Sequence, residues 1–365
     1  MNSNKYGRPN SSRITRTYHL APTTRAIRAA LAISMTMLAL GGSGAALAGT
    51  CSNDATANTE SCDGAFTNLP GASFVPVADL TLVLGGSAPT SVTPAAGTVG
   101  IDASWGGNVD VISHADITTA GADGIHEYGS TSATLDNYGS ITTHVTAAGA
   151  NAADISAYGD VTVVNGGDIL AYGTGSYAVT AVTAYSSHGN VSLDNLDTGT
   201  ITANSTGGSA VAVNTYAKIG SVNVTNEGAI SATSGNYVSA TGINAIAGDF
   251  ASVTNSGSIS SAAGNYGTAT GIHAVGLNSA TVINSGNITA NGSSGYGINA
   301  YASDGLATVS NTVDGTITVN ANNATGIRAD GYHGTSYVYN AATSMSPRPV
   351  ASTPARRLSA SRRRM

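Results

Sequence analysis

Short runs in which apolar and polar residues alternate recur along residues 100–340. In a clear copy, Gly242-Ile243-Asn244-Ala245, an apolar anchor is followed by a polar residue and then by alanine. Such alternation is typical of a β-strand with one buried face. The anchors that we assign are Ile101, Ile125, Ile155, Val182, Val213, Ile243, Ile272, Ile298 and Ile327. They recur about every 29 residues, a period that indicates a stacked repeat rather than a globular fold.

A second phrase follows each anchor by about a dozen residues, as in residues 253–259, Val-Thr-Asn-Ser-Gly-Ser-Ile. Its apolar residues and its asparagine share one parity, which predicts two more short strands with a bend between them. Three strands per period describe one coil of a parallel β-helix, whose inner face only neighbouring coils can bury. The sequence therefore predicts an all-β solenoid of about nine coils over residues 99–343.

The asparagine of the second phrase recurs at a nearly constant interval. Amide side chains stacked in this way can bond to one another along the solenoid and to the backbone of each bend. No proline occurs between Ala95 and Ser346, as expected where every strand has to donate to a ladder. The predicted column contains Asn137, Asn165, Asn195, Asn226, Asn255, Asn284, Asn311 and Asn340.

Tyrosines often occupy the third place after the anchor, which has the parity of the outer face. An exposed row of aromatic rings can stack on sugars or contact a protein partner. The alternative is that loops between the coils cover these rings and that they are only structural. The tentative binding ladder contains Tyr128, Tyr158, Tyr185, Tyr216 and Tyr301.

Charge is unevenly distributed along the chain. Only 9% of its 365 residues are charged, and of the 14 Lys and Arg only Lys218 and Arg328 lie between Arg28 and Arg348. All 20 acidic residues lie between Asp54 and Asp330, so the formal charge of this stretch is −18. Phosphate backbones would be repelled by such a surface, which excludes nucleic acid as a partner.

Residues 1–48 combine a long basic segment, an apolar run too short to span a bilayer and the small-residue site Ala46-Leu47-Ala48. This order predicts a secretory signal peptide with an extended basic front, with a buried apolar helix as the alternative. Export would place Cys51 and Cys62 in an oxidising compartment, where we expect them to form a disulfide rather than a metal site. Residues 49–98 are predicted to cap the open strand edges of the first coil.

The last 22 residues differ from the repeats. Residues 344–365 contain three prolines and six arginines, a composition that predicts a disordered basic tail. We interpret it as the product of a shifted reading frame or premature stop, with a genuine basic tail as the alternative.

With these features, the chain resembles the passenger domain of Gram-negative autotransporters, the type V secretion proteins. The resemblance covers residues 1–340 and rests on the long basic signal segment and on copies such as residues 253–259. It implies a right-handed β-helix and, in an intact version, a C-terminal outer-membrane barrel as translocator. No run of membrane strands follows the repeats, so the chain is expected to be truncated before that barrel. The implied location is the cell surface or medium where a barrel is available, and otherwise the periplasm.

Residues that would indicate catalysis are sparse. The sequence lacks a Gly-x-Ser-x-Gly elbow and histidine pairs at metal-ligand spacing, and Asp194 and Asp197 fit a turn better than an active site. His126 and His273 share one outward position without being on adjacent coils. We therefore expect no enzyme, cofactor or metal, and predict an adhesin-like rod that binds a host or neighbouring-cell glycan or protein, or a second copy of itself. A polysaccharide-acting β-helix enzyme and a truncated product without function are the alternatives.

Overall fold

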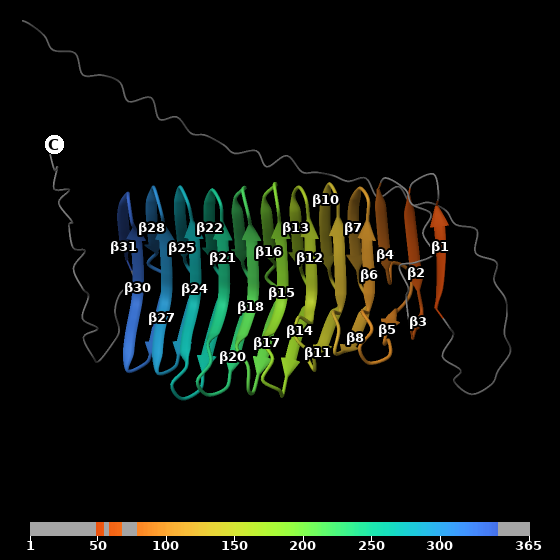
Figure 1. The fold of residues 1–365 in the computed structure, drawn as a ribbon, viewed down its shortest axis with the longest axis horizontal. Coiled ribbons are helices and arrows are strands. Elements are labelled where there is room, and N and C mark those ends of the chain that lie inside the picture. The colour runs from red at the N-terminus through yellow and green to blue at the C-terminus, as the bar shows by residue number, and fades with distance from the viewer. Residues whose placement is uncertain (1–48, 55–57, 68–78, 342–365) are drawn as a thin grey trace, which may run out of the picture. The chain divides into compact units, whose positions relative to one another are not determined.

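The computed structural model describes residues 49–54, 58–67 and 79–341, and every regular element in this part of the chain is a β-strand. From β4 onward, strands that lie three apart in chain order pair with one another, so successive coils stand side by side along the stack (Figure 1). Each coil from β6 to β29 contributes one strand to each of three sheets. The predicted all-β solenoid of about nine coils is confirmed.

The largest sheet has 12 strands. They are β1 (Thr50–Asp54), β2 (Thr59–Asp63), β4 (Leu80–Leu84), β7 (Asn108–Ser113), β10 (Ser132–Asn137), β13 (Val161–Asn165), β16 (Val191–Asn195), β19 (Val222–Asn226), β22 (Phe250–Asn255), β25 (Ser279–Asn284), β28 (Leu306–Asn311) and β31 (Thr335–Asn340).

The second sheet has 10 strands and the third has nine. The second contains β3 (Ala65–Phe66), β5 (Ser91–Val92), β8 (Asp116–Ala120), β11 (Ser140–His144), β14 (Asp168–Gly173), β17 (Thr200–Ser205), β20 (Ala229–Ser234), β23 (Ser258–Ala263), β26 (Asn287–Asn291) and β29 (Thr316–Asn320). The third contains β6 (Ile101–Trp105), β9 (Ile125–Gly129), β12 (Asn151–Ala157), β15 (Val179–Ser186), β18 (Ala210–Ala217), β21 (Ala240–Ala247), β24 (Thr268–Gly276), β27 (Ser294–Ala302) and β30 (Asn323–Gly331).

The core consists of columns of identical or similar side chains that point inward from consecutive coils. In the 10-stranded sheet one column is isoleucine in eight successive strands, and all but the last member are buried. Burying such a side chain contributes about 1.5–3 kcal/mol, but only when the next coil is present to cover it. The column contains Ile117, Ile141, Ile169, Ile201, Ile230, Ile259, Ile288 and Ile317.

The predicted anchors form a column in the nine-stranded sheet with one exception. Ile125 on β9 pairs with Ala153 on β12, and Ala153 pairs with Val182 on β15. Ile155 instead lies two residues further along β12, in register with Glu127 and Ala184. Both Ala153 and Ile155 are fully buried, so the shift leaves the inner face intact. It does change which outward residues become neighbours.

The predicted asparagine column is confirmed as an uninterrupted chain of hydrogen bonds. Each side-chain amide from Asn137 to Asn311 donates to the side-chain oxygen of the next asparagine at 2.7–2.8 Å. Most of these amides also donate to the carbonyl of a glycine after the bend, as Asn284 does to Gly286. A Cβ on that glycine would collide with the Gly257 carbonyl of the preceding coil, so the bends pack backbone against backbone.

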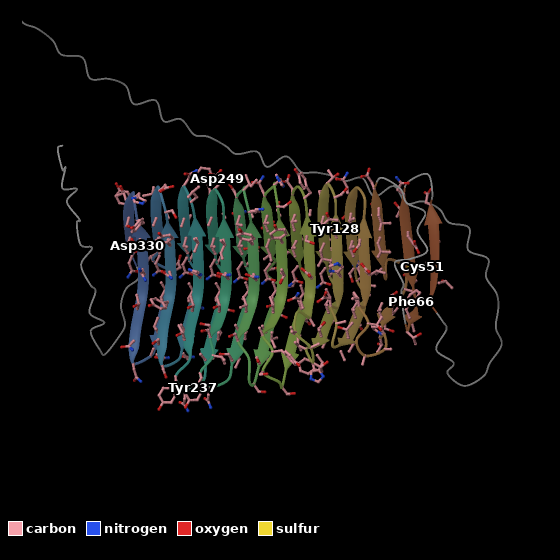
Figure 2. The ribbon with its side chains drawn as sticks, viewed as in Figure 1. Cys51, Phe66, Tyr128, Tyr237, Asp249 and Asp330 are labelled. Carbon is pink, nitrogen blue, oxygen red and sulfur yellow. A yellow bond between two sulfur atoms is a disulfide. The ribbon has the colours of Figure 1, made fainter. Side chains whose placement is uncertain are left out.

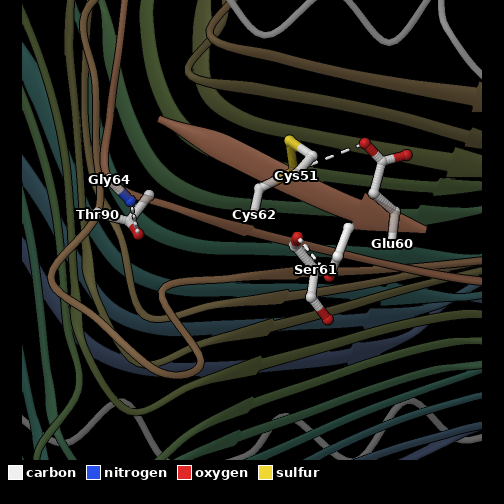
Figure 3. The surroundings of a disulfide bond; sticks show 7 residues. Cys51, Glu60, Ser61, Cys62, Gly64 and Thr90 are labelled. Atoms are coloured by element: carbon white, nitrogen blue, oxygen red, sulfur yellow. Dashed lines mark hydrogen bonds between the residues drawn. A yellow bond between two sulfur atoms is a disulfide. The ribbon is translucent and has the colours of Figure 1, made fainter. Parts of the chain in front are cut away.

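The two ends of the stack differ. At the N-terminal end β1 pairs antiparallel with β2, and a disulfide joins Cys51 to Cys62 across this pair (Figure 3). Gly64, just beyond β2, donates its N–H to the Thr90 hydroxyl at 3.0 Å. Strands β2 to β5 already run in register with the coils that follow, so much of the predicted cap at 49–98 belongs to two of the three sheets. At the other end of the described chain, β29, β30 and β31 form the sheet edges.

The predicted signal peptide at 1–48 and the predicted tail at 344–365 lie outside the described residues. Within the part that the structure describes, no helix has the length and apolar character needed to cross a bilayer.

Candidate functional site

The structure breaks the predicted tyrosine ladder. Tyr128 is in register with Ser156 on β12, because that strand is shifted by two residues relative to the prediction. Tyr158 therefore lies outside the row, beyond the end of β12, and its ring stacks on His188 with centroids 4.0 Å apart. The full row reads Ser104, Tyr128, Ser156, Tyr185, Tyr216, Ile246, Val275, Tyr301 and Asp330.

Only two members of the predicted ladder are stacked neighbours. Tyr185 and Tyr216 lie on adjacent strands, with ring centroids 5.6 Å apart and planes inclined by 26°. Tyr128 and Tyr301 are each separated from this pair by other residues. The ladder prediction is wrong as a continuous surface, and what remains of it is a short aromatic pair on the nine-stranded sheet.

A more exposed aromatic pair lies in the turns that join the 10-stranded and nine-stranded sheets. Tyr237 follows β20 and Tyr266 occupies the equivalent place after β23. Their rings are stacked, with centroids 5.0 Å apart and planes inclined by only 9°, and they are 75% and 73% exposed. Figure 2 shows Tyr237 projecting beyond the turn, away from the ribbon. We call these two residues the tyrosine pair.

Both members of the tyrosine pair have a strained backbone. Their φ angles are +65° for Tyr237 and +61° for Tyr266, in the left-handed region that costs an ordinary L-residue about 1–2 kcal/mol. Bulky side chains seldom occupy this region unless the surroundings impose it. Because the rings bury so little surface, packing in the core does not account for the strain.

Hydrogen bonds between successive turns hold the tyrosine pair in place. The N–H of Tyr237 donates to the Asn265 carbonyl at 2.8 Å, and the N–H of Tyr266 donates to the Ser293 hydroxyl at 2.7 Å. The N–H of Asn265 in turn donates to the side-chain oxygen of Asn236 at 2.8 Å. The two rings are therefore presented on a fixed backbone rather than on free loops.

An open pocket with amide and hydroxyl groups adjoins Tyr266. It lies across the turns of three successive coils, and every residue that lines it is small or uncharged. Amides and hydroxyls of this kind can both donate and accept hydrogen bonds. The lining residues are Ala263, Gly264, Asn265, Asn291, Gly292, Ser293 and Asn322. The tyrosine pair and this pocket together make an aromatic surface beside a hydrogen-bonding one.

The sequence contains a signal for the tyrosine pair that the anchor pattern did not reveal. Gly-Asn-Tyr occurs at residues 235–237 and again at 264–266, one coil apart, in turns where Tyr is an unusual choice. Residues in turns fall outside the period-two alternation, so the strand pattern carries no information about them.

Among the residues that the structure describes, one ionisable side chain is fully buried inside the solenoid. Glu127 on β9 is fully buried, and its Oε1 accepts a hydrogen bond from the Thr134 N–H at 2.7 Å. Burial raises the pKa of this carboxyl well above its ordinary value of 4.5, and the carboxylates of Asp110 and Asp136 raise it further. Its other oxygen, Oε2, is buried without a hydrogen-bond partner, so we interpret Glu127 as a destabilising element of the core.

Comparison with known families, curated proteins and solved structures identifies no relative of this chain. No family model matches the chain, and neither a curated protein nor a solved structure is significantly similar to it.

Proposed function

We propose that this protein is an adhesin-like passenger: a non-catalytic β-solenoid that presents the tyrosine pair and its neighbouring pocket to a glycan on a host or neighbouring cell. The observation that carries the proposal is the strained backbone of Tyr237 and Tyr266. Hydrogen bonds hold this backbone in place, although both rings are largely exposed to solvent. Such strain is most often retained where a binding surface requires it.

The chemistry of the surface favours a sugar over an apolar partner. Flat exposed rings stack on the apolar faces of sugar rings, while the amides and hydroxyls around Asn291 and Ser293 suit sugar hydroxyls. The scarcity of basic residues between Asp54 and Asp330 favours a neutral glycan over an acidic one. The resemblance to autotransporter passengers supplies the expected location outside the cytoplasm and belongs to the same proposal.

The test is glycan binding by the purified chain and by Tyr237→Asn/Tyr266→Asn. Asparagine tolerates the left-handed backbone, so this variant removes both rings without adding strain. We expect binding to weaken by about 5- to 150-fold, since two stacking contacts of about 0.5–1.5 kcal/mol each are lost. Unchanged binding by this variant would refute the proposal.

Two control variants separate the tyrosine pair from the other aromatics. Tyr158→Asn removes an exposed ring with an ordinary backbone, and Tyr185→Ala/Tyr216→Ala removes what remains of the predicted ladder. Neither should change glycan binding. Chromatography of the glycan after incubation distinguishes a binding protein from a polysaccharide-acting enzyme, because only the enzyme would shorten it.

A further inference from the structure

Three metal-ligating side chains meet on the outer face of the nine-stranded sheet. His126 projects from β9, Asp154 lies beside it in register on β12, and Asp123 precedes β9 by two residues. The Nδ1 of His126 lies 3.6 Å from Asp154 Oδ2 and 3.8 Å from Asp123 Oδ2. One ligand atom from each of the three residues lies within 4.8 Å of the others.

These separations are too long for hydrogen bonds. His126 Nδ1 is buried and has no hydrogen-bond partner, although the side chain as a whole is partly exposed. Asp123 is oriented by its other oxygen, which accepts the Asn151 N–H at 2.6 Å, so its Oδ2 is directed toward the histidine. An imidazole nitrogen and two carboxylate oxygens therefore lie around a common point, at ion-pair distances from the nitrogen.

We propose that Asp123, His126 and Asp154 bind a divalent transition-metal ion such as Zn²⁺. Zinc bonds to nitrogen and carboxylate oxygen of about 2.0–2.2 Å place neighbouring ligand atoms about 3–3.5 Å apart, close to the separations observed here. An imidazole with two carboxylates suits Zn²⁺ or Mn²⁺ better than Ca²⁺, which takes six to eight oxygen ligands. The partly open side of the cluster leaves room for water to complete the coordination.

The electrostatics of the cluster favour a bound cation. Asp102 on β6 lies in register with His126, so a third carboxylate adjoins the cluster. Three carboxylates thus share one imidazole, and a dication would relieve the repulsion between them. The competing interpretation is that a protonated His126 serves alone as their counter-ion.

The same row contains a matched control. His273 lies at the equivalent outward position on β24, five strands further along the nine-stranded sheet. Its Nδ1 is 3.0 Å from the side-chain oxygen of Asn244, and its other neighbour in the row is Asn299. Thus His273 has the backbone setting of His126 without the carboxylates.

The experiment is calorimetric titration of the untagged chain with Zn²⁺ at pH 7.5, with Co²⁺ absorption as a measure of coordination. We expect one Zn²⁺ per chain, and a loss of affinity of at least about 10- to 100-fold in His126→Gln and in Asp154→Asn, since even outer-shell substitutions cost that much. His273→Gln should bind like the parent. Affinity should fall at pH 5.5, because the metal has to displace the proton of His126 from among Asp102, Asp123 and Asp154.

Several outcomes would overturn the site. They are the absence of saturable binding at millimolar Zn²⁺, equal affinity of His126→Gln and the parent, or Ca²⁺ binding as tight as Zn²⁺ binding. The last two would indicate general attraction to an acidic surface. Urea denaturation without metal checks that each variant is folded. The proposal is independent of glycan binding, because the tyrosine pair lies in the turns after β20 and β23, in other coils.

Discussion

Strands β9 and β24 occupy the same sheet and the same register, yet they carry different chemistry. Two residues after the anchor, β9 has Glu127 and β24 has Ala274, and both are fully buried. One residue after the anchor, His126 lies among carboxylates, whereas His273 lies among amides. The coils near β24 repeat one pattern of alanine inside and amide outside, while those near β9 depart from it on both faces. The solenoid therefore departs locally from its regular pattern, with a carboxyl inside at β9 where β24 has alanine.

The largest expected effect comes from transferring the inner carboxyl of β9 to β24. Ala274→Glu would place a carboxyl between Ala245 and Ala300, where the parent has only small buried side chains. A carboxylate buried among these alanines should cost several kcal/mol of unfolding free energy in urea titrations at pH 8.

Ala274→Gln has the same length and no charge, so it measures the cost of volume alone. The difference in unfolding free energy between Ala274→Glu and Ala274→Gln should be smaller at pH 4.5, where the glutamate is protonated. A difference that did not change with pH would contradict the assignment of the loss to charge burial.

The next effect concerns the asparagine column near β24. Asn255→Ala removes the bonds from Asn226 to Asn255 and from Asn255 to Asn284, both 2.7 Å long, and leaves the Asn284 side-chain oxygen without this donor. We expect a loss of about 2–4 kcal/mol of unfolding free energy in urea, because both bonds are buried. Asn214→Ala is the control, since the Asn214 side-chain oxygen accepts a hydrogen bond from the Asn244 amide on the outer face, which should be worth less than about 1 kcal/mol. Equal losses would show that burial does not set the strength of these bonds.

A smaller effect, of opposite sign, is expected for Glu127→Gln. In the parent, the folded chain keeps a proton on Glu127 that the unfolded chain releases above the ordinary pKa of 4.5. The unfolding free energy of the parent therefore falls as pH rises from 4.5 toward the raised pKa, by about 1.4 kcal/mol per pH unit from this group. The glutamine keeps an oxygen for the Thr134 N–H and has no such slope.

Thermal midpoints at pH 4.5 and pH 8 test this prediction. The thermal midpoint of Glu127→Gln should be higher than that of the parent at pH 8, and this difference should disappear at pH 4.5. A variant that is less stable than the parent at both pH values would mean that Glu127 stabilises the core, contrary to the comparison drawn with β24.

The fold could be predicted because strand parity and the 29-residue period both depend on burial, and burial follows directly from side-chain type. The register of β12 could not be predicted in this way. A slip of one residue would have turned apolar side chains outward, but a slip of two keeps every face intact and is invisible to the alternation. Ile155 is larger than Ala153 and so fits the anchor pattern better, and counting from Ile155 assigns Tyr158 to the tyrosine row, which in the structure contains Ser156 instead. With Ile155 as the anchor, Asp154 does not align with His126. The cluster of these two residues with Asp123 therefore could not be predicted.

The smallest effect tests whether the regular pattern can be extended toward the N-terminal coils. The asparagine column begins at Asn137, whose side-chain oxygen is buried and accepts no hydrogen bond, because its neighbour on β7 is Ser113. Ser113→Asn would supply the missing amide donor and should raise the unfolding free energy in urea by up to about 1 kcal/mol. Ser113→Leu adds similar volume without a donor and should destabilise, since the preceding residue in register is the buried Leu84. If both variants lost stability equally, the space beside β4 would be too small for the amide, and the column would begin at Asn137 for steric reasons.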